Sequence, residues 1–357
     1  MRADEPADGA ADGAADGAAG AQRWRDRRRW AYAAFVLGLA GFVALVGIPT
    51  DRLGLAALAT GFLSIGLLGH GWRAWGRMLL DWLPFQAVLL FYDYSRGFAT
   101  PYSDAQMAAG DYPTHHVHNA LGLPLQVTPP IRFDQLLGAG TTPTQWLQLH
   151  LHPGPVDGSA IPWFAVLVSA VYCSHYLVTP VTAVVLWMRD RTLYRRWMSM
   201  VVTLAVAGLA TYVLLPTAPP WLASSQGDLS GAPVLRLTSE GFDQVGLHTV
   251  GSALALGQHL VNPVAAMPSL HVAFATLAAG FWWSRVRPGV RPLLLAYPAA
   301  MCFTLMYGGE HYALDEVAGI GYALVVLALA GVIRRSRRGE IPSPDPATGV
   351  LASHPAS

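Results

Sequence analysis

The sequence predicts an all-α integral membrane protein with about eight transmembrane helices, a helical-bundle catalytic core and extracytoplasmic loops. The composition is 53% hydrophobic and only 13% charged, whereas soluble proteins average about 25% charged residues. Apolar runs approach the roughly 20 residues that a helix needs to cross a bilayer. Arginine clusters follow every second run, as expected for alternating passes.

The apolar runs are bounded by Arg, Pro or Asp. They are residues 31–48, 53–71, 78–92, 161–187, 197–215, 265–283, 292–307 and 314–333. The third run is short and contains Asp81 and Pro84, and the fourth is long and contains Pro180. Because proline disturbs a helix, we expect these two spans to be kinked or tilted.

Four regions are predicted along the chain. Residues 1–22, rich in Ala, Gly and Asp, are expected to form a disordered tail, because such a composition buries little apolar surface. Residues 23–160 hold the N-terminal membrane helices and the first outer loop, and 161–333 the catalytic membrane core. Residues 334–357 are a basic stop followed by a second disordered tail. The late basic segment argues against a signal peptide.

Arginine placement predicts the orientation. Basic segments occupy residues 23–29, 73–77, 189–196, 285–291 and 334–338. Short cytoplasmic loops collect positive charge, so both termini are predicted to be cytoplasmic and the long loops 93–160 and 216–264 extracytoplasmic. These loops are long enough to form a partly ordered cap.

Several function classes are disfavoured. The net charge is +1 with no lysine, which provides no basic field for nucleic acid. The two cysteines, Cys173 and Cys302, lie in apolar runs, which is typical of buried thiols. Loop histidines could suggest a metal site, but no cysteine or carboxylate cluster accompanies them, so we expect no metal and no cofactor. These histidines are His115, His116, His118, His150 and His152.

Two short segments place ionisable groups at the ends of apolar spans, where charge is expensive and usually functional. The first is Met-Pro-Ser-Leu-His, residues 267–271, at the start of the sixth span. Ser269 suits a helix cap or a ligand contact. Free N–H groups at such a helix start form a phosphate site.

The second segment is Glu-His-Tyr-Ala-Leu-Asp, residues 310–315, at the start of the eighth span. His311 and Asp315 are four residues apart and share one face of a helix. The carboxylate can then accept one imidazole N–H and leave the other nitrogen as a base or nucleophile. Because the sixth and eighth spans start on the same side, His271 and His311 are predicted at one membrane level.

Two histidines and an orienting carboxylate suit a two-step phosphoryl transfer. One histidine attacks phosphorus, the other protonates the departing alkoxide, and a second acceptor releases the phosphohistidine. The alternative is that His271 is a helix-start residue and that His311 and Asp315 form a structural pair.

The two segments resemble the second and third signature motifs of the type 2 phosphatidic acid phosphatase superfamily, over roughly residues 161–333. The resemblance implies that His311 is the nucleophile, Asp315 its orienting partner, His271 the general acid and Ser269 a phosphate contact. It also implies a membrane phospholipid or lipid phosphate as the substrate.

The chain departs from the phosphatase branch. Leu270 replaces a usual glycine, Thr304 and Leu305 replace a Ser-Arg pair, and the lysine-containing first motif is absent. The Ser-Leu-His and His-Tyr-x-x-Asp motifs, with Leu-Pro-Thr-Ala-Pro-Pro-Trp at 215–221, look more like the inositol phosphorylceramide synthase branch. This resemblance favours transfer of a phospho-headgroup, with inositol phosphate as the favoured cargo.

Two alternative functions remain open, a lipid or polyprenyl phosphate phosphatase and a non-enzymatic lipid carrier. A phosphoryl transfer also needs a cation for the phosphate oxygens. The arginines predicted outside the cytoplasm are Arg52, Arg96, Arg132 and Arg236. Arg96 and then Arg132 are favoured as substrate-binding residues, together with Tyr312, and Arg52 is expected to be an interfacial anchor.

Overall fold

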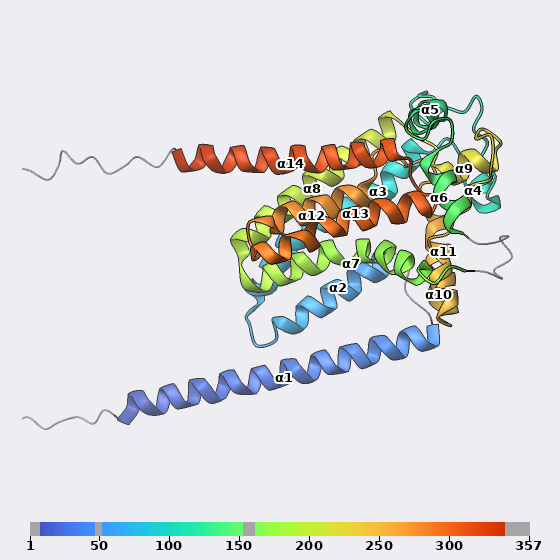
Figure 1. Ribbon diagram of the computed structural model, residues 1–357. Coiled ribbons are helices and arrows are strands. Elements are labelled where there is room, and N and C mark those ends of the chain that lie inside the picture. Colours follow the sequence, from blue (N-terminus) through green and yellow to red (C-terminus); the bar gives the residue numbers. More distant parts are fainter. Residues whose placement is uncertain (1–7, 47–51, 153–160, 340–357) are drawn as a thin grey trace, which may run out of the picture.

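The computed structural model describes residues 8–46, 52–152 and 161–339, and its regular structure there is helical. Long helices run side by side and short helices gather across one end of the bundle (Figure 1). The long helices are α1 (Asp8–Val46), α2 (Arg52–Gly66), α3 (Trp72–Ala99), α7 (Ala165–Arg189), α8 (Arg191–Leu214), α12 (Leu270–Trp283), α13 (Arg291–Tyr307) and α14 (Ala313–Gly339).

Each predicted apolar run coincides with one of these long helices. Among the described residues, four segments are long and apolar enough to cross a membrane: Ala165–Arg189, Arg191–Leu214, Pro288–Tyr307 and Ala313–Ile333. Two further apolar helices, Ala57–Gly66 and Leu270–Trp283, are shorter. Pro84 and Pro180 lie inside α3 and α7 as the sequence predicts.

The N-terminal segment differs from the sequence expectation. Disorder was expected through residue 22, yet α1 begins at Asp8. Alanine has the highest helix propensity. The segment also continues without a break into the apolar helix that follows, so it needs no helix nucleation of its own. Residues 1–7 and 340–357 lie outside the described residues, whereas the basic segment after residue 333 continues α14 to Gly339.

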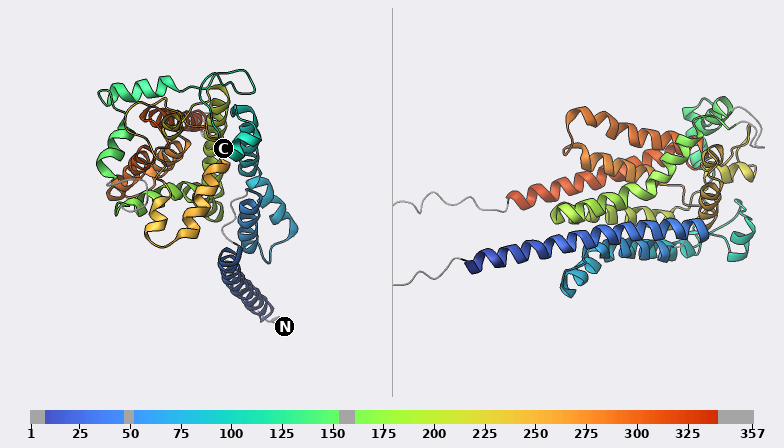
Figure 2. Two further views of the ribbon diagram at one scale, coloured as in Figure 1. Left: turned by 90° about the vertical axis from the view of Figure 1, so that its right-hand side faces the viewer. Right: turned by 90° about the horizontal axis from the view of Figure 1, so that it is seen from below.

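The bundle has two distinct ends. Helix α1 runs along its periphery (Figure 2), and its first described residues lie at the same end as the last residues of α14. The α2–α3, α7–α8 and α12–α13 turns lie at this end too, which agrees with the alternation of arginines. Arg28 of α1 donates to the carbonyl of Leu68 in the α2–α3 turn, at 2.7 Å. The starts of α12 and α14 lie at the opposite end.

That opposite end is covered by a cap of short helices, so the predicted partial order of the long loops is observed (Figure 1). The cap consists of α4 (Asp104–Ala109), α5 (Thr128–Leu137), α6 (Pro143–Leu151), α9 (Pro220–Ser225), α10 (Glu240–Gln244) and α11 (His248–Leu260). Reciprocal capping boxes begin two of them, Ser103 with Gln106 at α4 and Thr142 with Gln145 at α6.

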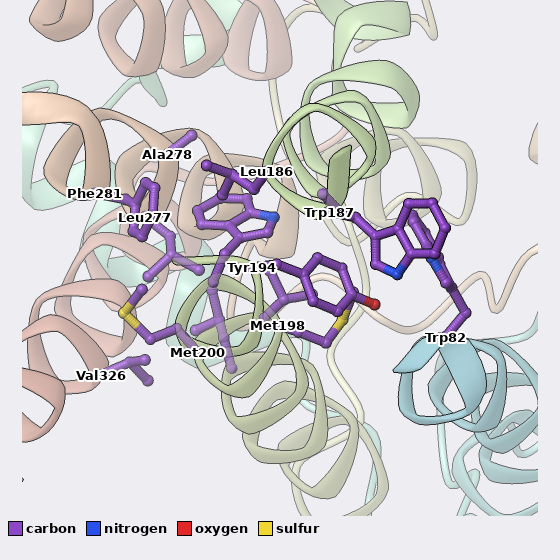
Figure 3. Packing of buried hydrophobic residues seen from close by; sticks show 14 of the residues in the cluster. Trp82, Leu186, Trp187, Tyr194, Met198, Met200, Leu277, Ala278, Phe281 and Val326 are labelled. Atoms are coloured by element: carbon purple, nitrogen blue, oxygen red, sulfur yellow. The ribbon is translucent and has the colours of Figure 1, made fainter. Parts of the chain in front are cut away.

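Helix α8 lies at the centre of the main apolar cluster. Trp197 is fully buried, and its ring meets that of Phe281 from α12 at a centroid distance of 5.0 Å. Tyr194 contacts Trp82 of α3, and Leu277 and Ala278 complete the packing from α12 (Figure 3). In a bilayer such close packing, rather than exclusion of water, holds helices together. This cluster fixes α12 and α14 relative to α8, and so positions their first residues.

Candidate active site

The start of α12 is tied to two other helices. Ser269 is the fully buried N-cap, and its hydroxyl accepts from the Val272 N–H at 3.4 Å. Its own N–H donates to the Asp315 carbonyl at 2.9 Å. The Tyr212 hydroxyl of α8 donates to the Pro268 carbonyl at 3.0 Å. His271, the second residue of α12, is thereby held in place.

The start of α14 is organised by two buried carboxylates. Asp315 Oδ2 accepts the Tyr312 N–H at 2.9 Å. Asp134 of α5 accepts the N–H groups of Ala313 and Leu314 at 3.0 and 3.3 Å, satisfying donors that the helix leaves unpaired. Because α14 begins at Ala313, His311 lies just before the helix rather than within it, which differs from the sequence expectation.

His311 and Asp315 nevertheless meet. The Nδ1 of His311 lies 3.5 Å from Asp315 Oδ2, which is within ion-pair range and longer than a normal hydrogen bond. Catalytic hydrogen bonds are often this long without substrate. Both side chains are buried, His311 at 5% exposed and Asp315 at 0%. The carboxylate can therefore orient this imidazole away from bulk water.

The two motif helices approach closely. A Cβ atom on Gly319 of α14 would overlap the carbonyl oxygen of Ser269, so glycine is required for this approach. The rings of His271 and His311 face each other edge to face, with centroids 5.8 Å apart. The structure thus brings together His271, His311, Asp315 and Ser269, as the motif positions predicted.

Helix α7 adds two aromatic residues that the sequence analysis did not single out. Tyr172 stacks on the His271 ring at a centroid distance of 5.2 Å, and His175 contacts it at 4.2 Å. The signal was present in the sequence, because His175 is an ionisable residue inside a predicted span and Tyr172 lies one helical turn before it.

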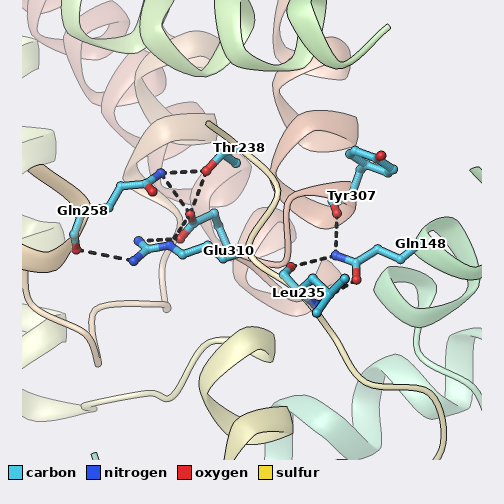
Figure 4. A network of polar contacts seen from close by, with 7 residues as sticks. Gln148, Leu235, Thr238, Gln258, Tyr307 and Glu310 are labelled. Carbon is cyan, nitrogen blue, oxygen red and sulfur yellow. Dashed lines mark hydrogen bonds and ion pairs between the residues drawn. The ribbon is translucent and has the colours of Figure 1, made fainter. Parts of the chain in front are cut away.

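An arginine from the cap lies beside the second motif. Arg236 pairs bidentately with Glu310, through Nε at 2.7 Å and Nη2 at 3.0 Å. Its guanidinium lies over the Trp221 ring, 4.9 Å from the centroid, and interacts electrostatically with His271. Glu310 also accepts from Thr238 at 3.1 Å and from Gln258 at 3.3 Å (Figure 4).

The cap segment that carries Arg236 is fixed to the motif segment. Gln148 of α6 donates to the carbonyls of Leu235 and Tyr307 at 2.9 and 2.7 Å (Figure 4). Gly309 has a φ of 75°, and a Cβ there would overlap the Leu235 carbonyl oxygen. The chain that leads into Glu310 and His311 therefore lies directly against the 235–238 segment.

The other predicted substrate-binding residues are on α3, on α5 and directly after His311. Arg96 is half-buried in the last turn of α3, and Arg132 is exposed on α5. Tyr312 is fully buried in an apolar cluster with Ile131 and Leu229 of the cap. The side chain of Arg52 lies outside the described residues.

The loop histidines each have separate partners where contacts are described. His115 pairs with Asp228 at 3.0 Å, His150 bonds the Trp146 carbonyl at 2.8 Å, and His152 contacts Glu240 at 3.4 Å. Across the described ranges, His, Cys, Asp and Glu side chains form no group of three that could hold a metal ion.

The buried Asp134 carboxyl is expected to make the stability of the fold depend on pH. Burial raises the pKa of this carboxyl from 3.8 to about 6, against the lowering effect of its two backbone hydrogen bonds and with a further rise from Asp315. The folded state therefore binds a proton that the unfolded state loses between about pH 4 and pH 6, so this group's contribution to stability falls as pH rises through that window, by at most about 3 kcal/mol.

The Asp134→Asn variant isolates this contribution. The difference in unfolding temperature between parent and variant, measured in detergent from pH 4 to pH 8, is expected to fall as pH rises from 4 to 6 and then to level off. A difference that is constant across this range, or that grows with pH, would contradict a raised pKa for Asp134.

Comparison with known proteins agrees with this geometry. A family model described as PAP2 superfamily matches residues 145–329, just over half of the chain. The phosphoinositol dihydroceramide synthase of Bacteroides thetaiotaomicron is 29% identical over 143 residues, which cover 38% of this chain and 45% of that protein. The inositol phosphorylceramide synthase catalytic subunit aur1 of Schizosaccharomyces pombe is 28% identical over 129 residues, covering 36% of this chain and 30% of that protein.

The chain thus spans less than half the length of these curated relatives, and no solved structure matches it significantly. The matched region contains both motif segments, the arginine of the cap, three of the four membrane-length segments and most of the fourth. With the two histidines and the aspartate brought together at the starts of neighbouring helices, the resemblance seen in the sequence is confirmed, and the chain belongs to the PAP2 superfamily.

Proposed function

We propose that this protein is a membrane lipid phosphotransferase that moves a phospho-headgroup between lipids through a covalent histidine intermediate. The observation that carries the proposal is the arrangement of three side chains. The ring centroids of His271 and His311 are 5.8 Å apart, and Asp315 Oδ2 lies 3.5 Å from Nδ1 of His311. An oriented nucleophile and a facing acid are the two groups that such a transfer needs.

In the first half-reaction, Asp315 holds Nδ1 of His311, which leaves Nε2 to attack phosphorus. The bond from phosphorus to the oxygen of the lipid backbone breaks, and His271 gives that oxygen its proton. The headgroup phosphate is then bonded to His311, and His271 is neutral. In the second half-reaction an acceptor hydroxyl attacks phosphorus and gives its proton to a neutral imidazole of the site, while the P–N bond breaks and its electron pair returns to the His311 ring.

Two groups near the histidines can donate hydrogen bonds to the phosphate oxygens of the substrate. The N-terminus of α12 directs backbone N–H groups and the positive end of its dipole toward the site. Arg236 adds side-chain donors: Glu310 engages two of its five N–H groups and the Gln258 carbonyl a third, at 3.4 Å, which leaves two for a ligand. We therefore favour Arg236 over Arg96 and Arg132 as the cation that binds the phosphate.

The names of the relatives suggest which headgroup is transferred. Both carry names that combine an inositol phosphate with a ceramide. Inositol phosphate is accordingly the proposed headgroup, and a long-chain lipid alcohol of the ceramide type the proposed acceptor.

The test is an assay of purified protein with a panel of headgroup-labelled phospholipids, each with and without dihydroceramide as the acceptor. We expect label from phosphatidylinositol to appear in a new lipid only when the acceptor is present. Label that appears mainly as water-soluble phosphate in both conditions would instead identify a phosphatase, and no turnover of any phospholipid would contradict both.

The active site is proposed to face the outside of the cell, because the arginine-rich turns lie at the opposite end of the bundle. The test uses a chain in which Cys173 and Cys302 are replaced by Ala. One variant carries Gln226→Cys in the cap, and the other carries Arg287→Cys at the end of the bundle with the arginine-rich turns; both positions are exposed. An impermeant thiol reagent should label only the first in intact cells and both after lysis. The reverse pattern would place the active site in the cytoplasm.

A further inference from the structure

A third histidine lies against the two motif histidines and has no part in the reaction above. His175 is in α7, and its ring centroid is 4.2 Å from that of His271, with the planes inclined at 43°. It also interacts electrostatically with His311. Three imidazoles, from α7, α12 and the segment before α14, thus gather at one place.

His175 presents a nitrogen without a partner. Its Nδ1 is buried and makes no hydrogen bond within the described part of the chain. The other rings around it belong to Tyr176 at 5.4 Å and Phe274 at 5.9 Å. A buried polar group left unsatisfied costs about 1–3 kcal/mol, and an ionisable residue within a span is costly in itself.

A purely structural role does not account for this arrangement. A structural histidine in a membrane helix is expected to hydrogen-bond a neighbouring helix or a backbone carbonyl. The adjacent Ser174 does so, because its hydroxyl contacts the Val171 carbonyl at 2.6 Å and the Tyr297 hydroxyl at 2.9 Å. His175 instead keeps Nδ1 unpaired beside a reactive histidine, as a group that awaits a ligand donor would.

The second half-reaction supplies such a donor. The acceptor hydroxyl must give up its proton as its oxygen bonds to phosphorus, and a neutral imidazole within reach is a suitable base. We infer that His175 Nδ1 binds the hydroxyl of the acceptor lipid and takes its proton in the second half-reaction. This assignment rests on the two-step transfer proposed above.

The proton balance closes over one cycle. His271 gives a proton to the departing lipid alcohol in the first half-reaction and becomes neutral. The acceptor oxygen then forms its bond to phosphorus, the P–N bond to His311 breaks, and the acceptor proton passes to His175. Transfer of that proton to the facing His271 ring restores the starting state. The two histidines thereby divide the work, with His271 essential to the first half-reaction and His175 to the second.

The experiment follows the covalent intermediate. Parent, His175→Phe, His175→Asn and His271→Phe proteins are mixed with headgroup-labelled phosphatidylinositol and dihydroceramide, quenched in alkali at intervals, and measured for label on protein and in new lipid. Phenylalanine keeps the ring volume, and asparagine keeps a polar acceptor near Nδ1 that cannot carry a proton. Tyr176→Phe, which removes a hydroxyl from a half-exposed neighbour, is the matched control.

We expect both His175 variants to acquire label on the protein at the parental rate, to retain it, and to make new lipid at least about a hundredfold more slowly. His271→Phe should acquire little label, and Tyr176→Phe should match the parent. New lipid made by His175→Asn within threefold of the parental rate would overturn the inference. So would slow labelling in both His175 variants when their unfolding temperatures match the parent. Absence of label on a parent protein that turns over would instead contradict the two-step transfer itself.

Discussion

Replacing His311 with Gln is expected to lower turnover by a factor of about 10⁴ or more, because it removes the imidazole that carries the proposed covalent intermediate. His271→Ala and Asp315→Asn should each cost about a hundredfold to ten-thousandfold, in the range of general acid–base and orienting contributions. Groups that act as a unit lose activity non-additively, so the triple variant should be little worse than His311→Gln alone. Initial rates of headgroup transfer in detergent measure these effects.

The control for this series is His150→Gln. His150 is exposed on α6, where it bonds the Trp146 carbonyl and stacks on the Trp146 ring, so the variant should match the parent. Unfolding temperatures within a few degrees of the parent would show that the site variants are folded. Near-parental turnover of folded Asp315→Asn would contradict the orienting role of this carboxylate.

Arg236→Gln is expected to lower turnover on the order of a hundredfold, since removing one well-placed donor from a developing oxyanion costs about 3 kcal/mol. A structural contribution has to be separated, because the substitution also leaves Glu310 buried without its charge partner. The double variant Arg236→Gln with Glu310→Gln removes this uncompensated charge. It should recover stability and should remain as inactive as the single variant.

The other arginines provide the comparison. Arg96→Gln and Arg132→Gln should remain within about threefold of the parent, because Arg96 lies in the last turn of α3 and Arg132 is exposed on α5, whereas Arg236 pairs with the second motif. If Arg236→Gln also stays within threefold, the backbone N–H groups of α12 and Ser269 bind the phosphate without an arginine. If the double variant regains activity together with stability, the role of Arg236 is structural.

Much of the fold could be predicted because it follows from local patterns. Each apolar run became a helix, and the arginine clusters lie at one end of the bundle, since length and flanking charge are enough to define a span. The helix over residues 8–22, a stretch whose composition favours a disordered tail, was not expected. Alanine-rich sequence without large apolar side chains can become helical when it continues an existing helix, and composition alone does not include that continuity.

The site was predicted only where residues are close in sequence or related by topology. His311 and Asp315 are four residues apart in the sequence. His271 could be placed near them because the spans that begin at His271 and His311 start on the same side of the membrane. Asp134 could not be predicted in this way, because a cap helix 179 residues earlier in the chain brings it to Ala313. The same holds for Arg236, which reaches Glu310 through a loop that Gln148 and Gly309 hold in place. Such contacts arise from tertiary packing rather than from periodicity.

The most direct test of the covalent mechanism is to find which residue carries the headgroup phosphate during turnover. Parent protein would be incubated with phosphatidylinositol without acceptor, so that the covalent intermediate accumulates, and would then be quenched in alkali, digested and analysed by mass spectrometry. The account predicts an acid-labile inositol phosphate on the peptide that contains His311, and none in the His311→Gln protein. The same modification on another residue, or an unmodified His311 peptide in a preparation that makes new lipid once acceptor is added, would contradict it.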